Sequence, residues 1–115
     1  MRIDILLTAG PFQFENWETA ASIAEAALDK GHEVAFFLSL DGVYNLVLRH
    51  SSPGSIGLPH QKFVTLLGRG ARALVCGTAA EMRGLECRNY PEGVAVGGLP
   101  DFAVQLGDVD RLISL

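Results

Sequence analysis

Charged residues are scarce in this sequence, and positive charge is scarcer still. Only 19% of the 115 residues are Asp, Glu, Lys or Arg, against about 25% in a typical globular domain. The formal net charge is −4, so the basic surface that nucleic-acid binding requires is missing. We therefore expect no direct nucleic-acid partner. A small domain with so little charge also favours an oligomer, in which subunits cover part of each other's surface.

The sequence also lacks long apolar runs and a recognisable targeting segment. It contains no stretch of about 18 uninterrupted apolar residues, so we expect no membrane span. The opening run, residues 1–7, includes Asp4 and has no signal-peptide cleavage pattern, which predicts a first strand instead of a targeting segment. Two cysteines without a secretory signal indicate a reducing compartment, and we expect a cytoplasmic protein.

Metal-binding and nucleotide-binding motifs are absent as well. The glycines at 68–70 and 97–98 do not complete a dinucleotide-binding or Walker motif, and roles in turns or helix stops explain them better. We therefore expect neither a metal nor an organic cofactor. The residues that ligate zinc are scattered without paired spacing: His32, His50, His60, Cys76 and Cys87.

Strand-like and helix-like segments alternate along the chain. Asn16 is the expected N-cap of the first helix, and Gly31 is its expected stop. The alternation predicts one domain, residues 1–115, of α/β architecture with a parallel sheet. We expect strands over 3–8, 34–38, 73–76, 94–96 and 111–115, helices over 17–30, 43–49, 61–67, 78–83 and 100–106, and a loop over 51–59.

Cys76 stands at a junction where chemistry is expected. It ends an apolar run and precedes Thr78 and Glu81, whose spacing matches a capping box at a helix start. A thiol between a buried strand and a helix N-terminus lies in a positive field that stabilises its thiolate. The alternative is a small apolar residue that finishes a core strand.

Chemistry in parallel sheets collects beyond the carboxyl ends of the strands. We expect three loops to share that edge: 8–11, 40–42 and 76–78.

Four aromatic residues are expected near this edge, and each has a functional and a structural interpretation. Phe12, Phe14 and Trp17 form either an aromatic lip over a pocket or subunit contact, or a hydrophobic staple that secures the first helix. Tyr44 follows the second converging loop. It either hydrogen-bonds near the thiol or is a half-buried tyrosine with a structural role.

The sequence disfavours a resting disulfide between Cys76 and Cys87. The helix expected between them would span roughly 9 Å at about 1.5 Å per residue. Disulfide-bonded cysteines have Cα atoms within about 7 Å of each other. Cys87 is then a secondary or resolving thiol, or a loop residue.

The order and spacing of short segments spread over nearly the whole chain form a recognisable pattern: 5–11, 31–34, 36–37, 41–45, 75–80, 83–84, 97–99 and 110–113. In this pattern the chain resembles the DsrE/DsrF/TusD-like family of small sulfur-relay proteins. The resemblance implies a three-layer α/β/α sandwich of flavodoxin-like or Rossmann-like type with a mainly parallel sheet. It also implies homo-oligomers, or hetero-oligomers with related subunits.

The same resemblance implies that Cys76 is the catalytic residue and carries sulfane sulfur as a persulfide. Gly77 and Thr78 are expected to support the anionic sulfur, and Asp41 and Tyr44 are further supporting candidates on a converging loop. The implied partners are a persulfide-bearing donor protein and an acceptor protein with a thiol. Two alternatives stay open: a non-catalytic structural subunit of an oligomeric sulfur-relay complex, and a thiol redox protein that uses both cysteines.

Overall fold

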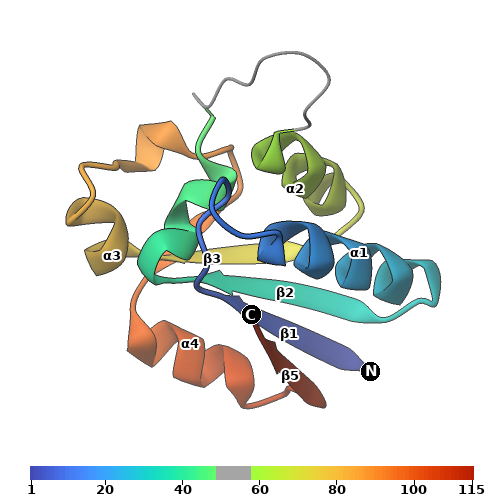
Figure 1. The fold of residues 1–115 in the computed structure, drawn as a ribbon. Helices are drawn as coiled ribbons and strands as arrows, with labels where there is room; N and C mark the ends of the chain where they lie inside the picture. The colour runs from blue at the N-terminus through green and yellow to red at the C-terminus, as the bar shows by residue number, and fades with distance from the viewer. Residues whose placement is uncertain (49–57) are drawn as a thin grey trace.

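The computed structural model describes residues 1–48 and 58–115, which contain a five-stranded parallel sheet (Figure 1). The spatial order of the strands is β4-β3-β2-β1-β5. The chain extends the sheet in one direction from β1 to β4 and then returns to the far side of β1, as in Rossmann-like folds. The strands are β1 (Arg2–Leu7), β2 (Glu33–Leu38), β3 (Arg72–Cys76), β4 (Ala95–Gly97) and β5 (Arg111–Ser114).

Helices cover both faces of this sheet and confirm the expected three-layer sandwich. α1 (Asn16–Asp29) and α2 (Pro59–Gly68) lie on one face, and α4 (Leu99–Leu106) lies on the other (Figure 1). α4 changes face because the last connection reverses direction across the sheet while the crossovers keep their right hand. Among the described residues, no helix has the length and apolar character needed to cross a membrane. The described residues also contain three short helices: η1 (Leu40–Leu46), α3 (Gly77–Glu81) and η2 (Cys87–Asn89).

The face under α1 and α2 holds the main hydrophobic core. α1 packs closely on the sheet because its buried positions are alanines. α2 contributes Phe63, whose ring meets Phe36 of β2 edge to face with centroids 5.1 Å apart. This arrangement is favourable because the positive edge of one ring meets the negative face of the other. Alternate residues of three strands point into this core: Ile3, Ile5, Leu7, Val34, Phe36, Leu38, Ala73 and Val75.

The opposite face of the sheet is covered more thinly. No residue of α4 is fully buried. Phe102 anchors the helix by stacking on Phe37 of β2, with ring centroids 4.3 Å apart. Two apolar side chains of the same helix, Leu99 and Val104, are largely exposed. This face therefore buries less apolar surface than the face under α1 and α2.

The structure corrects the expected boundaries of two helices. The segment expected to be helical over 43–49 is instead the 3₁₀ helix η1, which begins at Leu40. Leu40 has a positive φ of 50° and turns the chain from β2 directly into this helix. α2 begins at Pro59, two residues before the expected start, because proline suits the first helical turn, where no backbone donor is needed. Most of the expected 51–59 loop lies outside the described residues.

Asn16 does not cap α1 as expected. Glu15 occupies the cap position without a side-chain hydrogen bond. Asn16 Nδ2 instead donates to the backbone carbonyl of Leu115 at 3.2 Å, which ties the start of α1 to the residue after β5. A contact between residues so distant in sequence leaves no local signal. Gly31 does end the helix region with a positive φ of 81°, as predicted.

Asp4 is a fully buried carboxylic acid in the middle of β1. Neither carboxyl oxygen makes a hydrogen bond to another described residue, and Arg2 Nε lies 3.7 Å from Oδ1. Burial raises the pKa of Asp4 above its ordinary value of 3.8, and the nearby Gln105, Arg2 and Arg72 offset this effect only in part. The native state therefore holds the Asp4 proton at a higher pH than the unfolded chain does.

We expect Asp4→Asn to stabilise the protein at pH 7 by on the order of 1 kcal/mol. Below pH 3.8 the native state has its full advantage from neutral Asp4, and this advantage falls as pH rises through the raised pKa. The variant should therefore show a smaller loss of stability between pH 4 and 7 in urea unfolding. Asp29→Asn, at a carboxylate that is 63% exposed, is the control. Identical pH slopes for wild type and Asp4→Asn would contradict the prediction.

Candidate functional site

Cys76 is both the last residue of β3 and the N-cap of α3. Its side chain is half-buried against the hydrophobic core, and its thiol is free. In the sheet it is paired with Gly97 of β4. α3 and η1 lie at this same end of the sheet (Figure 1). Cys76 thus lies at the carboxyl edge, where parallel sheets place their chemistry, but two strands away from the β1–β5 reversal.

The expected capping box of Thr78 and Glu81 is wrong. α3 begins at Gly77, directly after the strand, and no side chain caps its first turn. In a capping box the paired side chains belong to the N-cap and to the third helical residue. Those positions are occupied here by Cys76 and Ala79, neither of which can form the box. Thr78 is an exposed residue inside the first turn.

A close approach at Gly42 holds the loops after β1 and β2 together. A Cβ atom added to Gly42 would collide with the Leu7 carbonyl oxygen and would lie 2.7 Å from the Leu7 carbonyl carbon. Glycine is therefore required for η1 to pass this close to the end of β1. From the sequence, Gly42 was expected only in a loop of the shared edge, and its role in spacing the loops emerges from the packing.

Asn45 strengthens the same contact with hydrogen bonds. Its side chain is fully buried, and Nδ2 donates to the carbonyl of Ala9 at 3.0 Å and to the carbonyl of Gly42 at 2.9 Å. These bonds connect the loop after β1 to η1. The sequence contained one signal of this role, a lone amide within the largely apolar run 43–48, which we did not assign to the site.

Asp41 and Tyr44 lie together on a shallow pocket beside this contact. Arg83 Nε donates to Asp41 Oδ1 at 2.9 Å, which links η1 to the turn after α3. The sequence did not predict this ion pair. The segment 76–78 does not line the pocket. The pocket has a volume of about 470 Å³ and is lined by Gly10, Pro11, Phe12, Gln13, Asp41 and Tyr44.

The side chain of Tyr90, directly after η2, connects this part of the chain to η1. Its hydroxyl donates to the Val43 carbonyl at 2.9 Å in the protein interior. Burial, with a smaller effect from nearby Tyr44, raises the pKa of Tyr90 to about 12, so the hydroxyl keeps its proton and remains a donor.

Cys87 is exposed in η2, and its thiol is free. Within residues 1–48 and 58–115, no group of three His, Cys, Asp or Glu side chains could hold a metal ion.

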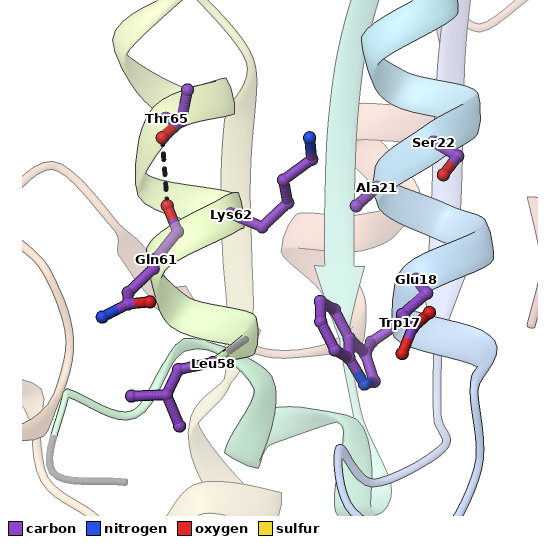
Figure 2. Close-up of a pocket in the computed structure, with 8 residues that line it drawn as sticks. All are labelled: Trp17, Glu18, Ala21, Ser22, Leu58, Gln61, Lys62 and Thr65. Carbon is purple, nitrogen blue, oxygen red and sulfur yellow. Dashed lines mark hydrogen bonds between the residues drawn. The ribbon is translucent and has the colours of Figure 1, made fainter. Parts of the chain in front are cut away.

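The three aromatic residues before and within α1 separate in the structure. Trp17 packs against the core and lines a groove of about 570 Å³ between α1 and α2, opposite Leu58 and Lys62 (Figure 2). Phe12 is 61% exposed and borders the pocket beside Asp41. Phe14 is exposed as well. Of the three, only Phe12 therefore forms a lip at the carboxyl edge, and Trp17 secures the start of α1.

Fold and site together define a small Rossmann-like α/β domain with one half-buried thiol where a strand meets a helix. The chain belongs to the DsrE/DsrF-like family, whose sequence profile matches residues 1–115. It is 28% identical over 111 residues to an uncharacterized protein of Methanopyrus kandleri, covering 96% of this chain and 91% of that protein. An uncharacterized protein of Methanocaldococcus jannaschii is 25% identical over 114 residues, which cover 99% of both chains.

Solved structures share the same fold at low sequence identity. The ychN protein from E. coli matches with a TM-score of 0.83 and 22% identity, over 100% of this chain and 99% of that one. A protein of unknown function from Methanobacterium thermoautotrophicum matches with a TM-score of 0.77 and 18% identity, over 99% and 98% of the two chains. At these identities the likeness establishes the fold alone.

Gly42→Ala is expected to lower the free energy of unfolding by about 2–3 kcal/mol, because the backbones of β1 and η1 must move apart. Gly68→Ala is the matched control, since it adds the same methyl group where no atom lies within 4 Å. The control should change stability by less than about 0.5 kcal/mol. Urea unfolding of both variants measures the difference, and equal midpoints would show that the loops do not depend on Gly42.

Proposed function

We propose that this protein accepts sulfane sulfur as a persulfide on Cys76 and passes it to a thiol of a partner protein. The observation that carries the proposal is the position of a free, half-buried thiol at the carboxyl edge of the sheet in a DsrE/DsrF-like chain. Reactive cysteines are typically partly exposed, since a fully buried thiol is inert and cannot meet its partner.

The proposed transfer takes place in two thiol-exchange steps without net oxidation. The Cys76 thiolate attacks the outer sulfur of a donor persulfide, and the donor leaves as a thiolate that takes up a proton. Cys76 then carries an S–SH group. A thiolate of the acceptor attacks the outer sulfur, which restores the Cys76 thiol and leaves the persulfide on the acceptor. Because only sulfur and protons move, neither a metal nor an organic cofactor has a part in the reaction.

The supporting residues divide into two groups in this proposal. Gly77 and Thr78 follow the thiol, and the first backbone N–H groups of a helix have no partner within it, so we expect them to face the anionic sulfur. Asp41 and Tyr44 border the neighbouring pocket, where we expect the partner chain to dock. The ion pair of Asp41 with Arg83 keeps η1 and the turn after α3 in place around this docking position.

We further propose a cytoplasmic protein that works as an oligomer, with copies of itself or with related subunits. Charged residues make up only 19% of the sequence. Several large apolar side chains are exposed, among them Phe14, Met82 and Leu99. We expect the subunit interface to cover some of these side chains, because contiguous exposed apolar surface is characteristic of protein-binding sites.

Cys76→Ser should abolish sulfur loading. After incubation with a low-molecular-weight persulfide, intact mass should show the gain of a single sulfur atom in the wild-type protein and in the control Cys87→Ser. Cys76→Ser should show no gain, because serine provides no thiolate. Addition of a thiol acceptor should then remove the sulfur from the loaded proteins.

The same measurement distinguishes the two alternatives. Loss of two hydrogen atoms without gain of sulfur, absent in either single variant, would indicate a redox protein that uses both cysteines. An unmodified wild-type mass would indicate a structural subunit. Sulfur gained equally by Cys76→Ser would place the reactive thiol at Cys87 and contradict the proposal.

A further inference from the structure

A third cavity lies on the opposite face of the sheet from α1 and α2, next to α4. Its volume is about 400 Å³. It lies at the starts of three strands, because its lining includes Arg2 of β1, Arg72 of β3 and Ala95 of β4. Cys76 lies at the other end of these strands, so the cavity is separate from the thiol site. The size is sufficient for a small metabolite.

Charged and polar groups face one another at one side of this cavity. The fully buried Asp4 carboxyl group lies 3.7 Å from Arg2 Nε and also interacts with Gln105 and Arg72. Arg2 Nε and Gln105 Nε2 are buried beside it, without a hydrogen bond of good geometry. Each guanidinium group has five N–H donors, so the two arginines have more donors than the single Asp4 carboxyl group can accept.

The sheet register explains why the arginines gather there. Asp4 of β1 is paired with Ala35 of β2, which is paired in turn with Arg72 of β3. Ala35 is small, so the Asp4 carboxylate and the Arg72 guanidinium interact across it. Arg2 stands two residues before Asp4 and therefore shares its face of the sheet. The buried acid thus holds two guanidinium groups at the cavity, where they can bind an anionic group.

Acidic and aliphatic side chains complete the lining. Asp101 and Asp108, from α4 and the turn after it, supply negative charge. Asp101 Oδ2 accepts a hydrogen bond from the Gly98 backbone at 2.8 Å, which fixes the position of this carboxylate. Leu74 and Val104 provide aliphatic surface. The cavity thus combines positive charge, negative charge and a small apolar wall.

We propose that this cavity binds a small zwitterion of the α-amino-acid type with an aliphatic side chain. The ligand's carboxylate pairs with the guanidinium groups of Arg2 and Arg72. Its ammonium group faces Asp101 and Asp108, and its side chain contacts Leu74 and Val104. This proposal does not depend on the sulfur-transfer function, because the two sites share no residue.

The test uses L-valine as the probe and its two halves, isobutyrate and isobutylamine, as matched controls. In titration calorimetry with the full chain, L-valine should bind with a Kd on the order of 1 mM, and each half at least about tenfold more weakly, a difference of about 1.4 kcal/mol. Arg72→Leu should weaken L-valine binding by about tenfold, because it removes one guanidinium group. Arg69→Leu is the matched control. It removes the same charge from a residue that does not line the cavity and that pairs with Asp29, so it should leave L-valine binding unchanged.

Three results would overturn the proposal. The first is the absence of L-valine binding at about 20 mM, where a millimolar site would be nearly saturated. The second is isobutyrate or isobutylamine binding as tightly as L-valine, which would show that the second charge is not recognised. The third is unchanged L-valine binding in Arg72→Leu, whose fold is checked by circular dichroism. None of these results bears on sulfur loading at Cys76.

Discussion

The carboxyl edge of this protein depends on the close passage of η1 over the end of β1. Gly42 permits that passage, because any larger residue would collide with the Leu7 backbone. Asn45 then bonds to the carbonyls of Ala9 and Gly42, so both loops have one fixed spacing. Arg83 extends the arrangement to the turn after α3. The thiol therefore lies beside loops whose positions are set by packing and hydrogen bonds, and this rigidity is what a site on loops needs to act reproducibly.

Different interactions hold the helices on the two faces of the sheet. Under α1 and α2 the interior is apolar and tightly packed, with the edge-to-face pair of Phe36 and Phe63 at its centre. Under α4 a single stacked pair anchors the helix, and charged groups around Asp4 are buried without hydrogen bonds. Apolar burial of the first kind stabilises the fold. Polar burial of the second kind costs free energy, because the groups lose their hydrogen bonds to water.

The position of Cys76 followed from local pattern, whereas its supporting contacts did not. The strand–glycine–helix order around it predicts the junction that the structure contains. The capping box failed because α3 begins at Gly77, directly after the strand, which makes Cys76 the N-cap. The partners of Asp41 and Asn45 lie many residues away in the chain. Spacing along the sequence carries no information about such contacts, since they arise when separate loops converge.

The sequence alone determined the α/β class, the parallel sheet and the position of its thiol, because hydrophobic runs, helix stops and turn residues act over a few neighbouring positions. Only the tertiary structure decided that α4 covers the opposite face, that Gly42 sets the loop spacing and that Asp4 is buried between arginines. These features depend on strand order and register, which join residues that are distant in the chain.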